Sequence, residues 1–239
     1  MISLTKVYNM DALQFLAGLE SESVDMVLTD PPYCNGGIKG SSRRRPTSEK
    51  IQQSGTKDLK PDFVGDTRDQ RSFEKWLRLW MTECWRVCKD GSYMACFMDW
   101  RNLACVIDSL QVVGFAYRGL FCWVKPNGRP QRNAFKNDVE FVVWGTKGQP
   151  KPGPGGDRYC PGHYVGHPMT VKDRIHGTEK PVELLERLLT FVPEGGLVID
   201  PFAGSGSTGE ACHNLGLDFK GCELVEEYAR LATERLEAL

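Results

Sequence analysis

The four residues Asp30-Pro31-Pro32-Tyr33 could bind and orient an amino group. They follow the apolar run 24–28, so we expect them at the end of a strand, where open α/β sheets bind ligands. The two prolines fix the backbone and remove donors, and an ionised Asp30 only accepts hydrogen bonds. The Tyr33 ring could stack on a base. The pattern favours a site for an exocyclic amino group, although a plain proline-rich turn could have the same sequence.

A second motif that could bind a ligand follows the apolar run 197–199, where Gly204, Gly206 and Gly209 match G-x-G-x-x-G. Glycines let the backbone approach a ligand closely, and the helical segment that follows offers free N–H groups. Glu223 comes about 20 residues later, where a carboxylate can accept hydrogen bonds from ribose hydroxyls. The turn alone fits a nicotinamide cofactor, S-adenosylmethionine, or no ligand. A P-loop is excluded because no Gly-Lys-Ser/Thr is present.

Taken in this order, the two motifs resemble the DNA amino-methyltransferase family in its circularly permuted, beta arrangement. There Asp-Pro-Pro-Tyr precedes the Phe-x-Gly-x-Gly of the cofactor site. Residues 176–181 and residues 10–13 resemble two further family segments, and the resemblance covers the chain except 34–69 and 145–174. It implies a site-specific enzyme that flips a base out of double-stranded DNA and methylates it from S-adenosylmethionine by direct displacement, without a metal.

The base and the quaternary state also follow from the resemblance. Family members that methylate cytosine N4 usually have serine where this chain has Asp30, so adenine N6 is the expected target and cytosine N4 the alternative. A nicotinamide-dependent oxidoreductase is a remote alternative that leaves residues 30–33 unexplained. We expect a homodimer on family analogy alone.

The resemblance assigns a role to each matching residue. Asp30 and the Pro31 carbonyl would accept from the target amine beside Pro32, and Tyr33 would stack on the base. Asp200 would meet the cofactor's ammonium group, and Glu223 its ribose hydroxyls. The other expected cofactor residues lie around the adenine end, the carboxylate and the methionine portion: Asp11, Thr178, Lys180, Phe202, Gly204, Gly206 and Thr208.

Alternating strand and helix patterns predict the frame that holds these motifs. Apolar runs predict strands at 4–8, 24–28, 93–98, 120–124, 139–144, 197–199 and 219–222. Helical spacing of apolar residues predicts helices over 73–88, 182–192 and 228–236. We therefore expect an α/β fold over 1–239 as one domain, a doubly wound, mostly parallel sheet of about seven strands that is Rossmann-like.

Composition favours a globular, cytoplasmic protein. Hydrophobic residues make up 41% and charged residues 26%, no apolar run could span a bilayer, and no signal peptide is recognisable. The nine cysteines lie mostly in apolar runs, which favours free thiols. Cys160, His163 and His167 have ligand-like spacing but no fourth ligand nearby, so we expect no metal.

Basic clusters predict contacts with DNA phosphates. The net charge is −1, yet residues 39–60 and 118–151 each hold seven basic and two acidic residues. We expect two irregular segments: 34–69 over the active site, and 145–174 as a short target-recognition region. Solvated loops with no function are the alternative for both. The residues expected to bind nucleic acid are Arg43, Arg44, Arg45, Lys125, Arg129 and Arg132.

Overall fold

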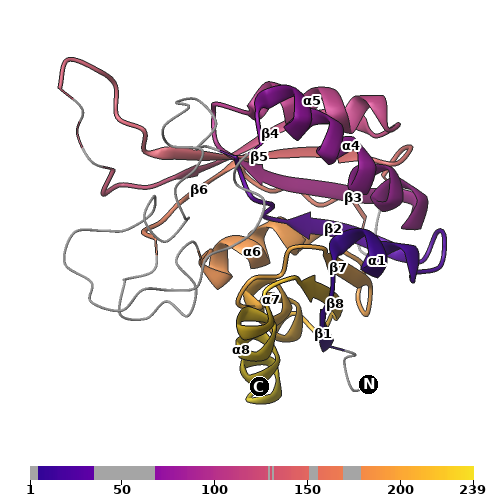
Figure 1. Cartoon of the computed structure of the whole chain (residues 1–239). Coiled ribbons are helices and arrows are strands. Elements are labelled where there is room, and N and C mark those ends of the chain that lie inside the picture. The colour runs from indigo at the N-terminus through magenta and orange to yellow at the C-terminus, as the bar shows by residue number, and fades with distance from the viewer. Residues whose placement is uncertain (1–4, 35–67, 129, 131, 151–155, 169–178) are drawn as a thin grey trace.

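A single sheet with helices on both faces forms the core of the protein (Figure 1). The computed structural model describes residues 5–34, 68–128, 130, 132–150, 156–168 and 179–239. Within these residues the sheet has eight strands in the order β1-β8-β7-β2-β3-β5-β4-β6. The strands are β1 Thr5–Asn9, β2 Val24–Thr29, β3 Cys88–Met98, β4 Ala116–Val124, β5 Val139–Thr146, β6 His163–Val165, β7 Leu197–Asp200 and β8 Asp218–Glu223.

The sheet is mostly parallel, as predicted. Strands β1, β8, β7, β2 and β3 run in one direction, and β6 is parallel to β4. Only β5 breaks the pattern, because it is antiparallel to both β3 and β4. The predicted α/β doubly wound fold is confirmed, with one strand more than expected among the described residues. The additional strand, β6, lies inside 145–174, which was predicted to be irregular throughout.

The helices divide between the two faces. The helices are α1 Ala12–Ala17, α4 Gln70–Val87, α5 Leu103–Val112, α6 Val182–Leu188, the 3₁₀ turn η2 Leu189–Phe191, α7 Ser207–Asn214 and α8 Glu226–Glu237. Helices α1, α4 and α5 contribute to one hydrophobic cluster, and α6, α7 and α8 to the other. Helices α1 and α5 fall outside the stretches predicted to be helical. No described helix is long and apolar enough to cross a membrane.

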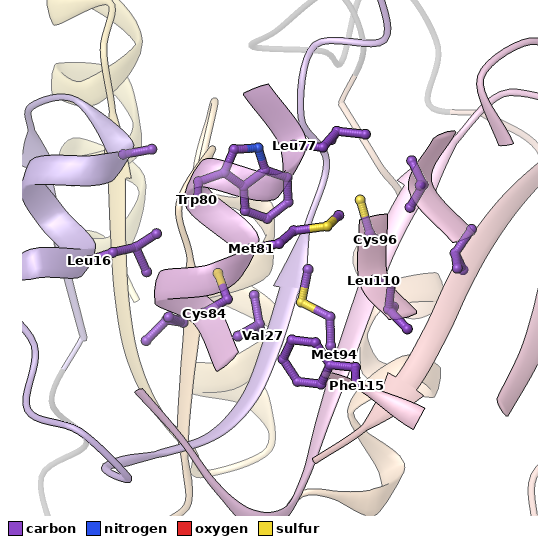
Figure 2. Packing of buried hydrophobic residues seen from close by; sticks show 14 of the residues in the cluster. Leu16, Val27, Leu77, Trp80, Met81, Cys84, Met94, Cys96, Leu110 and Phe115 are labelled. Atoms are coloured by element: carbon purple, nitrogen blue, oxygen red, sulfur yellow. The ribbon is translucent and has the colours of Figure 1, made fainter. Parts of the chain in front are cut away.

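Helix α4 anchors the first face through a stripe of buried side chains. Asp69 caps its first turn by accepting from the backbone N–H groups of Arg71 and Ser72, both at 3.0 Å. Leu77, Trp80 and the neighbouring Met81 then lie against the sheet, fully buried (Figure 2). Residues spaced three and four apart share one face of a helix, which explains why these side chains meet the same cluster.

Several of the residues expected to function lie at one edge of the sheet, where their strands end. Strands β2, β7 and β8 are parallel, so their carboxyl ends lie together, bringing Asp30, Asp200 and Glu223 to the same edge. Because β5 is antiparallel to β3, its beginning rather than its end lies there, with Phe141 opposite Met98. Glu140 therefore joins the three carboxylates.

Candidate active site

The carboxylate of Asp30 is held from one side by Lys180. The two residues lie 150 positions apart, and Lys180, which precedes α6, is 6% exposed. Its ammonium donates to Oδ2 of Asp30 and lies 3.5 Å from Oε1 of Glu140. The other oxygen, Oδ1 of Asp30, is buried and has no hydrogen-bond partner among the residues that the structure describes. One acceptor of Asp30 is thus fixed by Lys180, while the other is buried and unsatisfied among the described residues.

Tyr33 is held at both its ring and its backbone. Its hydroxyl donates to Oε1 of Glu140 at 2.6 Å, and its carbonyl accepts from Nδ2 of Asn102 at 2.7 Å. Lys125 completes the group by donating to Oε2 of Glu140 at 3.2 Å. The sequence had identified Tyr33, but neither Glu140 nor Asn102. For Glu140 the only signal was one carboxylate inside a predicted apolar strand.

The charges in this group balance, with two ammonium groups against two carboxylates. Burial raises the pKa of Asp30 above its usual value, and Lys180 opposes that shift by favouring the ionised form. Burial would also raise the pKa of Glu140, but Lys180 and Lys125 outweigh it and lower this pKa to about 2. Burial lowers the pKa of Lys180, yet Asp30 and Glu140 more than offset this and the pKa lies above its usual range. Lys180 is therefore a cation at neutral pH.

Asp200 sits at the end of β7, where three donors converge on it. Its Oδ1 accepts from Oγ1 of Thr29 at 2.7 Å and from the N–H of Phe202 at 3.0 Å, and its Oδ2 accepts from Oγ1 of Thr208 at 2.8 Å. The side chain is nevertheless 2% exposed, and burial outweighs the hydrogen bonds, raising the pKa of Asp200 to about 6. Oδ2 retains capacity for one more donor.

The glycine-rich turn leaves space beside a second carboxylate. Gly204 has φ +52, and a Cβ built on it would meet no atom within 4 Å. Its N–H donates to Oε2 of Glu223 at 3.1 Å, while Oε1 of Glu223 accepts from the N–H of Val225 at 2.8 Å. Burial raises the pKa of Glu223. Gly206, with φ +80, lies so close to α8 that a Cβ would come within 3.1 Å of the Cβ of Ala232.

Two further predicted cofactor residues border this turn. The Phe202 ring packs on α4, with its centroid 5.4 Å from that of Trp76 and 5.2 Å from that of Trp80. Asp11 caps α1 by accepting from the N–H of Leu13 at 2.8 Å. It follows β1, which pairs with β8 and so brings Asp11 towards Glu223.

The structure places only some of the residues expected to bind nucleic acid or cofactor. Arg43, Arg44, Arg45, Arg129 and Thr178 lie outside the described residues.

Two of the residues expected to bind nucleic acid are described, Arg132 and Lys125, and Arg132 is exposed in the loop between β4 and β5. The ammonium of Lys125 is instead bound to Glu140, so this side chain belongs to the charged group around Tyr33. Whether it also contacts DNA stays a prediction.

Comparisons with known proteins bear on the whole chain. The model of the N6/N4 methyltransferase family, described as DNA methylase, matches residues 24–234. Type II methyltransferase M2.DpnII of Streptococcus pneumoniae is 29% identical over 256 residues, covering 95% of this chain and 88% of that protein. Putative methylase YubD of Escherichia coli (strain K12) is 28% identical over 235 residues, with coverage of 96% and 88%.

Two solved structures are similar in fold. The M1.HpyAVI–SAM complex has a TM-score of 0.68 at 24% identity, covering 97% of this chain and 98% of that one. The PvuII DNA methyltransferase (cytosine-N4-specific) has a TM-score of 0.72 at 17% identity, with coverage of 98% and 87%. The family match spans both the Asp30 end of the site and the Gly204 turn. The chain therefore belongs to the DNA methylase family of N6/N4 methyltransferases.

Proposed function

We propose that this protein transfers the methyl group of S-adenosylmethionine to N6 of adenine in double-stranded DNA. The observation that carries the proposal is the divided carboxylate of Asp30. Oδ2 is bound by Lys180, while the buried Oδ1 has no partner in the described part of the chain. Leaving a buried acceptor unsatisfied costs about 1–3 kcal/mol, so an amino group that donates to Oδ1 would relieve that cost on binding.

The groups around the glycine-rich turn fit the cofactor. A ligand with an ammonium group and two ribose hydroxyls needs separate carboxylates, which Asp200 and Glu223 provide at neighbouring strand ends. The open space over Gly204 gives the ligand room between them. Phe202 and Gly206 would line the methionine portion, and Asp11 would lie towards the adenine end. Bound there, S-adenosylmethionine supplies a methyl group already activated by its sulfonium.

Asp30 and Pro31 would act on the target nitrogen as paired acceptors. An N–H donated to Oδ1 of Asp30 and another to the Pro31 carbonyl would draw the amino group out of conjugation with the ring and expose its lone pair. The acceptors would also stabilise positive charge that develops on nitrogen during direct displacement. Lys180 supports this role because its charge favours the ionised, accepting form of Asp30.

Tyr33 would hold the flipped base against these acceptors. Its ring orientation is restricted by the bond from its hydroxyl to Glu140 and by the bond from Asn102 to its carbonyl. A fixed ring loses less freedom when a base stacks on it, and positioning of this kind contributes strongly to methyl transfer between two bound groups. Glu140 is thus a positioning residue in the proposal.

Adenine is proposed over cytosine because Asp30 opens the tetrapeptide. Cytosine N4 presents a chemically similar amino group, and the fold is shared with a cytosine-N4-specific enzyme, so the base must be measured. A homodimer is proposed on family analogy, and light scattering at micromolar concentration tests it: a fully active monomer would refute it.

The decisive experiment is mass spectrometry of nucleosides from DNA incubated with the protein and methyl-labelled cofactor. We expect labelled N6-methyladenine. N4-methylcytosine alone would overturn the choice of base, and no labelled nucleoside would overturn the function.

Asp30→Asn is the matched variant because it keeps the side-chain shape and removes the charge. It should reduce methyl transfer by about 100-fold or more, the scale seen when one preorganised electrostatic contact is lost. Cofactor affinity, measured by calorimetry, should change little. Equal loss of both would contradict the division of roles between Asp30 and the glycine-rich turn.

A further inference from the structure

Phe135 is an aromatic side chain with almost no protein around it. It lies in the loop of residues 125–138 between β4 and β5 and is 96% exposed, more than any other large hydrophobic residue described. Residues 132–137 are all exposed, although the backbone of Ala134 forms an isolated β-bridge. The connection extends beyond the end of the sheet at the left of Figure 1. An apolar ring in such a place is typical of a binding surface rather than a core.

The loop is closed at its base, which makes it a narrow projection. The N–H of Lys125 donates to the carbonyl of Asp138 at 2.7 Å, and the N–H of Gly128 donates to the Lys125 carbonyl at 3.1 Å. The two arms approach so closely that a Cβ on Gly128 would lie 2.4 Å from the Cβ of Asp138. Asn133 turns the chain with φ +55, a conformation that asparagine tolerates. Phe135 follows this turn.

The charges around Phe135 fit a polyanion. Arg132 and Lys136 flank it and are exposed, and neither forms an ion pair with another described residue. Exposed cations of this kind can neutralise phosphates, and an aromatic ring between them can reach stacked bases. A bare ring flanked by positive charge is poorly suited to an apolar protein groove.

The loop also begins and ends in the active site. Lys125 at its start and Glu140 just after its end bind each other at 3.2 Å, and Glu140 accepts from the hydroxyl of Tyr33. A DNA duplex that delivers a base to Asp30 must therefore lie beside the loop. A flipped base leaves a gap in the stack, and apolar side chains of this size can insert between base steps.

From these observations we infer that Phe135 enters the DNA duplex as a wedge and fills the space that the flipped base vacates. The inference rests on the proposed function, because it describes how the target base would leave the duplex and reach the site at Asp30. It requires the ring only when the base must leave an intact base pair of the duplex.

Methyl transfer on two substrates tests the wedge. The first is a duplex with the site found by mapping methylated positions on genomic DNA, and the second has an abasic position opposite the target adenine. Phe135→Ala should lower kcat/KM on the first by at least about fivefold, the lower range for a base–aromatic stack, and change it less than twofold on the second. Tyr117→Ala, at the opposite end of β4, should change neither. Equal losses on both substrates, or no loss on the first, would overturn the inference.

A binding measurement separates failure of the wedge from failure of the proposed function. With 2-aminopurine in place of the target adenine, the wild type should raise fluorescence on binding, and Phe135→Ala should lose most of that rise even where no methyl is transferred. An unchanged rise would overturn the wedge and leave the proposed function standing. Conversion of a dimer to a monomer by Phe135→Ala would show that a second copy of the chain covers the ring, and would also overturn it.

Discussion

The pKa of Asp200 gives a prediction about cofactor binding that can be worked out numerically. On the proposed assignment, the carboxylate binds the ammonium group of the cofactor and must be ionised to do so. With a pKa of about 6, Asp200 is mostly ionised at pH 7 and mostly protonated at pH 5. The ionised fraction falls from roughly 0.9 to roughly 0.1 across that range, so cofactor affinity should fall about tenfold. The cofactor's own α-amino group, with a usual pKa of about 7.7–8.0, stays protonated throughout.

Isothermal titration calorimetry at constant ionic strength measures this change. Asp200→Asn should bind more weakly at pH 7 and lose most of the pH dependence. The variant is a necessary control because burial also raises the pKa values of Glu223 and Asp30, and any slope left in Asp200→Asn comes from groups other than Asp200. Wild-type affinity that is the same at pH 5 and pH 7, or an equal slope in both proteins, would refute the reasoning.

The same carboxylate affects folding stability in the opposite direction to a salt-bridged aspartate. Its folded pKa of about 6 exceeds the ordinary value of 3.8, so the folded state binds more protons between those pH values. The free energy of unfolding should therefore fall by about 2 kcal/mol as pH rises from about 4 to about 6. Denaturant unfolding of the wild type and Asp200→Asn at both pH values measures this, and an equal fall in both would contradict it.

Three other substitutions test the site and the core. Glu140→Gln should lower kcat by about tenfold with a smaller effect on cofactor affinity, since it weakens charge-assisted bonds worth about 1.5–3 kcal/mol around Tyr33; unchanged kcat in steady-state assays would contradict this. Gly206→Val should weaken cofactor binding by more than about tenfold because Gly206 has φ +80 and lies against Ala232; calorimetry with wild-type affinity would refute it. Leu77→Ala should lower the free energy of unfolding by about 2–5 kcal/mol because Leu77 is fully buried. A urea midpoint unchanged from the wild type would contradict this and show that neighbouring side chains fill the cavity.

Strands with continuous apolar runs were predictable because burial on both faces requires such sequences. Strand β6 was not, since it has only three residues and two of them are exposed. Glu140 could not be identified as part of the site, because the sequence of a strand does not show which residues a single carboxylate in it will contact. Those partners, Tyr33 and Lys180, meet it through the antiparallel register of β5 and through contacts far apart in sequence. Lys125 was expected to face DNA, and its contact with Glu140 depends on the same register.

The pairing of β1 with β8 has a consequence for how the protein is made. Glu223 is fixed in part from the N-terminal side, because its carbonyl accepts from Nδ2 of Asn9 at 3.0 Å across 214 residues and from the N–H of Met10 at 3.2 Å. On the ribosome, β1 emerges long before β8, so the edge of β1 that pairs with β8 stays unpaired until β8 has been synthesised. Such edges are prone to aggregation, and contacts this distant form slowly. The nascent chain therefore depends on β8 and α8 both to cover β1 and to complete the surroundings of Glu223.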